Sequence, residues 1–249
     1  MNITKQPDDD WVEKHRAAWE RKSGLRDYYQ TQIFDRIISE MNNGETLQLG
    51  TGPGLFARYH PGMVNSDITD HDGVDVVADV HDLQFEDTSF DNIIGVDVLH
   101  HFARPGFALR ECARVLRPGG RIILVEPWVG PMGWLFFKYI HHEDCAEVPD
   151  PWNEAFPGDK KPMDGNAAIP TIVLHKRAAK FSDNAPELQI VKKQPFGSLS
   201  FILTGGFQNI GLPAPVIRLL YKLENILPRP VLAFIAVRAL FVLEKRPPS

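Results

Sequence analysis

The sequence has few of the features that mark secreted, disulfide-bonded or nucleic-acid-binding proteins. Its 249 residues include two cysteines, and its first ten residues lack the basic and apolar regions of a signal peptide. A net charge of −5 gives no broad basic field for a phosphate backbone. The most apolar run, residues 231–243, is too short to span a bilayer. We therefore expect a protein of the reducing cytoplasm that does not bind nucleic acid.

A glycine-rich turn follows a short apolar run that begins at Thr46. Gly50, Gly52 and Gly54 predict a buried strand, a tight turn and then a helix, and they let a ligand approach the bare backbone. A dinucleotide fingerprint needs a third glycine where this chain has Leu55, and no Lys-Ser or Lys-Thr pair follows the glycines. A nicotinamide oxidoreductase is therefore disfavoured, while a plain turn stays open.

Strand and helix patterns alternate from residue 46 to residue 127, which predicts a mostly parallel, doubly wound sheet. Asp67 lies near the end of a predicted strand over residues 62–68, and Asp79 near the end of one over 74–80. Because an open α/β sheet meets its ligand at the carboxyl ends of its strands, both aspartates are candidate contacts. A role in a turn or helix cap is the alternative for each.

Residues 46–127 resemble the core of the class I S-adenosylmethionine-dependent methyltransferases. The resemblance is carried by the glycine turn, by Leu-His-His at 99–101 and by Arg-Val-Leu-Arg-Pro-Gly-Gly at 114–120, the last two being typical of the small-molecule branch. It implies an α/β fold: a Rossmann-like, doubly wound, mostly parallel seven-stranded sheet with an antiparallel last strand.

The resemblance also implies S-adenosylmethionine as the cofactor and gives each contact a role. The methionine part would be wrapped by Gly50, Thr51, Gly52 and Gly54, and its ammonium would meet the carbonyl of Gly95. The ribose hydroxyls would bind Asp67, and the adenine would bind Asp79 and the backbone of Val80.

Gln48 departs from the family pattern, which has an aspartate or glutamate two residues before the first glycine. Glutamine keeps an acceptor oxygen but loses the charge that faces the cofactor's ammonium. Hydrogen bonds to charged groups contribute about 1.5–3 kcal/mol against about 1 kcal/mol for neutral ones, so we expect cofactor binding to be weaker by about tenfold.

Methyl transfer needs a protein base only when the acceptor is a hydroxyl or a protonated amine. The candidates for this role are His100, His101, Glu126, His141, His142 and Glu143. A structural role at the start of a helix is the alternative for His100 and His101, and a solvated loop is the alternative for residues 141–143. Although residues 141–145 could all ligate a metal, adjacent side chains cannot all face one ion, so we expect no metal site.

We expect one methyltransferase domain over residues 1–249, with a helical cap (1–44), a cofactor-binding core (45–127) and lid insertions with closing strands (128–249). In the cap, Gly24 is expected to separate two helices, and Arg26 and Tyr29 either pack on the core or close over a ligand. Residues 146–170 predict a lid. Helices are expected at 128–140 and 167–181, and strands at 188–204 and 239–245.

Residues 231–243 predict a core helix followed by the final strand, with a membrane-docking surface for a lipid-linked acceptor as the alternative. The segment after residue 96 has no Asn-Pro-Pro-Tyr motif of the amine-methylating type, and no cysteine stands where a C5-cytosine enzyme needs its nucleophile. The sequence therefore predicts methylation of a small molecule, sugar or lipid-linked acceptor, at oxygen. The alternative is a sensor or assembly protein that binds the cofactor without catalysis. The oligomeric state stays open.

Overall fold

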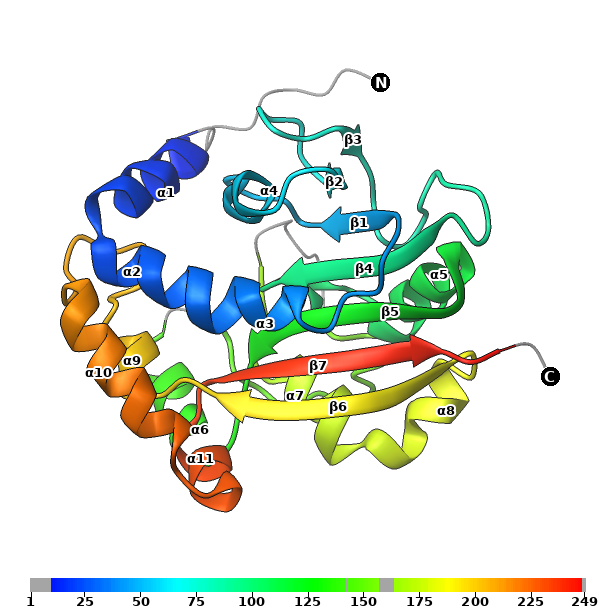
Figure 1. The fold of residues 1–249 in the computed structure, drawn as a ribbon. Helices are drawn as coiled ribbons and strands as arrows, with labels where there is room; N and C mark the ends of the chain where they lie inside the picture. The colour runs from blue at the N-terminus through cyan, green and yellow to red at the C-terminus, as the bar shows by residue number, and fades with distance from the viewer. Residues whose placement is uncertain (1–9, 142, 157–163, 248–249) are drawn as a thin grey trace.

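A seven-stranded mixed sheet in the order β3-β2-β1-β4-β5-β7-β6 forms the centre of the protein (Figure 1). The computed structural model describes residues 10–141, 143–156 and 164–247. The first five strands run parallel, while β7 is antiparallel to both β5 and β6. This arrangement confirms the predicted fold class. The strands are β1 (Thr46–Leu49), β2 (Val64–Asp67), β3 (Val76–Val77), β4 (Phe90–Val96), β5 (Leu116–Pro127), β6 (Leu188–Phe196) and β7 (Arg238–Lys245).

Helices cover both faces of the sheet and the edge at which its parallel strands end (Figure 1). One face carries α5 (Pro105–Val115), α7 (Ile169–Thr171) and α8 (Phe181–Asn184), and the other carries α2 (Ser23–Tyr28), a π-helical turn (Tyr29–Phe34) and α3 (Asp35–Ile38). The remaining helices are α1 (Asp10–Arg21), α4 (Leu55–Tyr59), α6 (Pro131–Tyr139), α9 (Leu199–Ile202), α10 (Ala214–Asn225) and α11 (Arg229–Ile235).

The core has two layers because neighbouring strand residues point to opposite faces of the sheet. Ile93 and Ile122 pack in the layer that contains α5, whereas Ile94 and Ile123 pack in the layer that contains α2. All four side chains are at most 1% exposed. The centres of β4 and β5 therefore read as continuous apolar runs, as expected for strands covered on both faces.

Several predicted boundaries are wrong for local reasons. Gly24 lies inside α2, and the break between the two cap helices is at Lys22, whose backbone is extended. A Cβ on Gly24 would lie 2.0 Å from the carbonyl oxygen of Leu212, so glycine permits close packing of α2 against the segment before α10. The predicted strand 188–204 ends at Phe196 because Gly197 adopts a φ of +63°, and α9 follows. The strand predicted at 74–80 contains only Val76 and Val77.

The two helices expected after residue 127 are shorter than predicted. The first begins at Pro131, and the second is divided into α7, a π-helical turn over Ile172–Lys176, a 3-10 turn over Ala178–Lys180 and α8. For residues 231–243, the final strand is buried as expected, but no residue of α11 is buried. Within the described ranges, the helices are too short or too polar to cross a bilayer.

Candidate functional site

The predicted glycine turn connects β1 to α4 at the edge where the parallel strands end (Figure 1). Gly50, Gly52 and Gly54 have φ values of +59°, +52° and +72°, which residues with a Cβ atom rarely adopt. Thr51 is buried between them, and its backbone amide donates to the carbonyl of Ser66 at the end of β2. The turn is thus tied to the neighbouring strand and leaves the backbone of the glycines uncovered by side chains of their own.

Asp67 fixes this turn from the end of β2. Its Oδ2 accepts a hydrogen bond from the backbone amide of Gly52 at 3.0 Å, and its Oδ1 accepts from the amide and hydroxyl of Thr69 at 3.1 and 3.0 Å. The Nε2 of His71 lies 3.5 Å from the same Oδ2. The carboxylate is 9% exposed and therefore pre-positioned beside the turn.

Gln48 provides the test of whether the site fits a cationic ligand. Its side chain is 4% exposed on β1, and its Oε1 has no hydrogen-bond partner among the described residues. A buried acceptor without a partner costs about 1–3 kcal/mol, which a donor from a bound ligand would recover. An ammonium group is such a donor, so the residues around the turn fit the methionine part of the predicted cofactor.

The other predicted cofactor contacts lie around the same strand ends. Asp79 lies two residues beyond β3, half exposed, and Val80 packs partly against the core. Burial would raise the pKa of Asp79, but hydrogen bonds from the backbone and ring of His81 lower it. Gly95 lies inside β4, one residue before its end, and a Cβ there would meet a methyl of Val98 at 2.4 Å. The contacts of these residues with a cofactor stay a prediction.

The N-terminal cap approaches the turn through residues that the sequence did not single out. A Cβ on Gly52 would lie 3.4 Å from the ring of Trp11, and Arg16 donates to the carbonyl of Pro53 at 3.1 Å. Arg26 instead donates to the carbonyls of Trp19 and Glu20, so it closes the end of α1 and not the ligand site. The sequence indicated Arg26 and Tyr29 as the cap's candidates for the ligand site, and it assigned no ligand-site role to Trp11 or Arg16.

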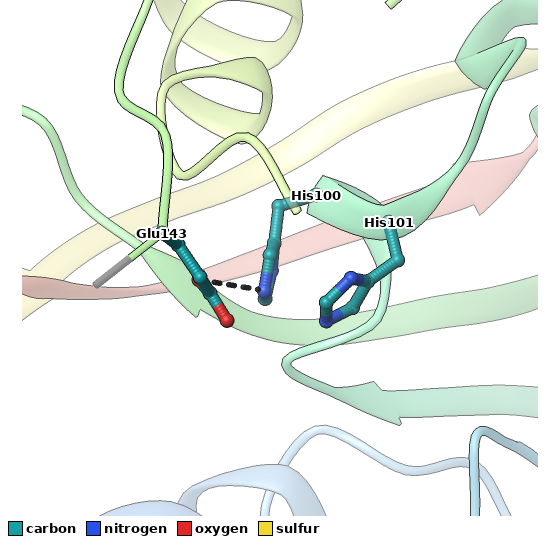
Figure 2. Close-up of side chains that lie close together, drawn as sticks. All are labelled: His100, His101 and Glu143. Atoms are coloured by element: carbon teal, nitrogen blue, oxygen red, sulfur yellow. Dashed lines mark ion pairs between the residues drawn. The ribbon is translucent and has the colours of Figure 1, made fainter. Parts of the chain in front are cut away.

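The histidine pair follows β4 on a 3-10 turn, Leu99–His101 (Figure 2). The Nδ1 of His100 donates to Oε2 of Glu126 at 2.8 Å, and its Nε2 lies 3.4 Å from Oε2 of Glu143. Burial would lower the pKa of His100, but the two carboxylates raise it to about 10. His100 is therefore a buried imidazolium at neutral pH.

Glu126 is fully buried at the end of β5 and does not face an open crevice. Its Oε1 accepts hydrogen bonds from the backbone amides of Val98 and Leu99 at 2.8 and 2.7 Å, and its Oε2 accepts one from the ring of His100. The candidate base Glu126 is thus buried, with both carboxylate oxygens hydrogen-bonded within the protein. The carboxylate positions His100 and the start of the histidine turn.

His101 lies beside this cation, with its ring centroid 4.1 Å from that of His100 (Figure 2). Burial and the charge of His100 lower the pKa of His101, so its ring is neutral at pH 7. Its Nδ1 donates to the carbonyl of Asp164 at 3.1 Å, which leaves Nε2 as the acceptor. Both histidines belong to the Leu-His-His motif at 99–101, and the sequence alone does not show which ring is neutral and which is charged.

Glu143 comes from the segment after α6 and faces His100 (Figure 2). Burial would raise its pKa, but the hydrogen bond and charge of His100 lower it to about 2. The Nδ1 of His141 is 3.8 Å from the same carboxylate. His142 lies outside the described residues.

Two overlapping groups in this cluster place ligand atoms within 4.8 Å of one another: His100 with His101 and Glu143, and His100 with Asp97 and Glu126. The sequence prediction of no metal concerned residues 141–145, whereas this cluster combines Glu143 with the rings of His100 and His101, which the 3-10 turn brings together. A metal would have to displace a proton from the imidazolium of His100. We therefore interpret the group as a proton-handling cluster.

Comparison with known proteins agrees with this geometry. Residues 47–124, which contain the glycine turn, Asp67 and the histidine pair, match a family model described as a methyltransferase domain. This match covers about a third of the chain, so the central part of the chain is similar to a methyltransferase domain. The domain and its strand order make S-adenosylmethionine the implied cofactor.

The relatives share the domain but not the whole chain. Human "Probable tRNA methyltransferase 9B" is 36% identical over 149 residues, which cover 55% of this chain and 29% of the relative. Demethylmenaquinone methyltransferase of Thermotoga maritima is 33% identical over 106 residues, covering 36% of this chain and 46% of the relative. This chain thus spans less than a third of the first relative and less than half of the second.

A solved structure supports the fold over nearly the full length of this chain. The Haloferax volcanii protein solved with the Trm112 methyltransferase activator has a TM-score of 0.53 and 16% identity, covering 98% of this chain and all of the other. At this identity the likeness shows the fold alone.

Proposed function

We propose that the chain transfers a methyl group from S-adenosylmethionine to an oxygen of a small-molecule, sugar or lipid-linked acceptor. The cofactor supplies the electrophilic methyl group and its own leaving group. The ribose would be held by Asp67, the methionine by the glycine turn and Gln48, and the adenine by Asp79 and Val80. The protein must then align the acceptor and remove its proton.

The observation that carries the oxygen assignment is the neutral His101 next to the charged His100. The Asp164 carbonyl accepts from Nδ1–H of His101, which leaves the lone pair of Nε2 to act as a base. Glu126 and Glu143 hold His100 as a cation, which disfavours protonation of His101 in the resting protein. A base of this kind suits a hydroxyl, whose proton must leave during transfer.

The position of the pair relative to the cofactor site supports the same role. Val98, two residues before His100, lies against Gly50 and Gly95, where a Cβ would come within 2.4 Å of its methyl groups. The histidine turn therefore begins directly at the predicted methionine site. The backbone of Gly165 covers both rings, since a Cβ there would lie 3.0 Å from each.

Nucleic acid is not the proposed acceptor, although one relative is described as a tRNA methyltransferase, because the chain carries a net charge of −5. The experiment measures S-adenosylhomocysteine binding by calorimetry and then methyl transfer to free sugars, polyprenyl-linked sugars, phenols and unmodified tRNA, detected by mass spectrometry. We expect binding and a methylated hydroxyl. Binding without any methylated product would favour the sensor alternative, and a methylated tRNA would overturn the acceptor assignment.

A further inference from the structure

The helices α6, α10 and α11 lie at one end of the protein (Figure 1), and each presents apolar side chains to solvent. The α11 helix packs against α6, and α10 leads into α11 through Pro228. We call these outward side chains the α6–α10–α11 face; they are Met132, Trp134, Leu135, Tyr139, Ile140, Val216, Leu219, Leu223, Ile226, Val231 and Phe234, each 39% to 78% exposed.

The α10 helix is apolar on two opposite sides. Val216, Leu219, Leu223 and Ile226 follow a spacing of three, four and three residues, and at 3.6 residues per turn they lie within a sector about 80° wide. The buried residues Ile217, Tyr221 and Glu224 lie on the opposite side and pack inward. A surface helix needs one apolar stripe to join a core, so the outer stripe requires another explanation.

The exposed charged side chains on the segments that form this face are all positive. Residues 131–140 and 197–236 contain one carboxylate, that of Glu224, which is buried and accepts hydrogen bonds from Ser198 and Ser200. Their exposed charged residues are Lys138, Arg218, Lys222 and Arg229. Arg218 is paired with Asp27, while the chain as a whole has a net charge of −5. The α6–α10–α11 face is therefore locally cationic on an acidic protein.

The α6 helix adds the aromatic composition of a membrane interface. The Nζ of Lys138 lies 4.4 Å from the ring centre of Trp134, and Trp134 and Tyr139 meet edge to face at 6.0 Å. Trp134 and Phe234 border a groove of about 550 Å³ between α6 and α11. Amphipathic indole and phenol rings beside lysine favour the boundary between water and acyl chains.

We propose that the α6–α10–α11 face docks on the surface of a bilayer that contains anionic lipids. The outer stripe of α10 and the aromatic residues of α6 would enter the acyl boundary, and Lys138, Lys222 and Arg229 would meet the headgroup phosphates. Docking in the interface plane needs no spanning helix. The proposal rests on composition and charge at this face and does not depend on methyl transfer.

Cosedimentation with vesicles tests the proposal. The full chain is mixed with vesicles of phosphatidylcholine alone or of phosphatidylcholine with phosphatidylglycerol, at low and high salt. We expect binding to the phosphatidylglycerol vesicles, weakened by salt. The double variant Leu219→Glu/Leu223→Glu should weaken that binding about tenfold or more, because it places carboxylates on the outer stripe of α10.

The matched control is Val191→Glu, which adds a carboxylate at an exposed apolar residue of β6 that is 46% exposed. It should bind vesicles like the parent. Circular dichroism and cofactor binding confirm that each variant is folded, so a lost interaction cannot reflect unfolding. Absence of binding to phosphatidylglycerol vesicles, equal loss in Val191→Glu, or a dimer of the parent that the double variant dissociates would overturn the proposal.

Discussion

The backbone amide of Gly52 donates to the Oδ2 of Asp67 across 3.0 Å, joining the glycine turn to the end of β2. This bond makes one carboxylate responsible for two things. It holds the turn in its left-handed conformation, and the resemblance to the methyltransferases predicts that it also binds the cofactor's ribose. Loss of the carboxylate should therefore weaken cofactor binding more than a lone ligand contact would.

We expect Asp67→Asn to weaken S-adenosylhomocysteine binding about tenfold and Asp67→Ala about a hundredfold. Asparagine keeps an acceptor for Gly52 but not the charge, whereas alanine removes bonds that contribute about 1.5–3 kcal/mol each when one partner is charged. Calorimetry measures both affinities. Asp70→Ala, at an exposed carboxylate three residues later, is the control. Unchanged binding in Asp67→Ala would show that the ribose lies elsewhere.

Gln48→Glu should tighten S-adenosylhomocysteine binding about tenfold, because a carboxylate faces an ammonium better than an amide oxygen does. Since the side chain is 4% exposed, the free variant should also melt at a lower temperature than the parent and recover when the ligand is added. Calorimetry and thermal unfolding provide the two readouts.

Gln48→Leu is the matched variant, because it keeps a similar side-chain length and removes the unpartnered Oε1. It should bind the ligand more weakly than the parent while the free protein is as stable or more stable. Equal affinities for the parent and both variants would mean that the ammonium does not reach β1.

The cofactor half of the site was largely predictable from sequence because its signals are local. Gly50, Gly52 and Gly54 fix a turn within five residues, and Asp67 follows at the end of the next strand. The early end of β6 also has a local signal, since Gly197 takes a positive φ, but the apolar residues after it outweighed that signal.

The proton-handling half was not predictable, because its properties depend on distant partners. Which ring of the 99–101 motif is charged is decided by Glu126, Glu143 and Asp164, which lie 26 to 63 residues further along the chain. The sequence also does not show that the 3-10 turn places His100 and His101 ring against ring. The approach of Trp11 to Gly52 is equally long-range.

The pH dependence of methyl transfer should identify His101 as the base. Its pKa is lowered from 6.5, so kcat/KM should rise with pH below that value and then stay level until His100 loses its proton near pH 10. His101→Ala should lower kcat about a hundredfold or more while cofactor affinity is kept. A variant whose residual activity keeps the acidic limb would show that another group is the base.

Glu143→Gln gives an independent check on that assignment. The charge of Glu143 raises the pKa of His101, so its removal should move the acidic limb to lower pH. The same variant should lower the pKa of His100, because Glu143 also stabilises the imidazolium. A purely structural role of Glu143 would lower activity at every pH without moving the limb.

Protein stability should decrease as pH rises from about 6.5 to about 10. The folded protein holds the proton of His100 up to a pKa of about 10, whereas the unfolded chain releases it near 6.5, so the folded state binds more protons in this range. The slope is at most about 1.4 kcal/mol per pH unit for one group. Urea unfolding at several pH values measures it. His100→Asn should flatten the slope, and His60→Asn, outside the cluster, should not.

Asp97→Asn should destabilise the fold by about 2–3 kcal/mol in urea unfolding. Arg238 is 3% exposed, donates to both carboxylate oxygens of Asp97 at 2.5 and 2.9 Å, and lies 4.9 Å from the ring centre of Phe201. Asparagine tolerates the φ of +59° at this position, so the cost reports the lost charge and not the backbone. The value is below that of a fully buried pair because Asp97 is 31% exposed.

The double variant Asp97→Asn/Arg238→Met should recover part of the loss, since it no longer buries an unpaired guanidinium. A cost below about 0.5 kcal/mol for Asp97→Asn would show that Arg238 does not need its partner.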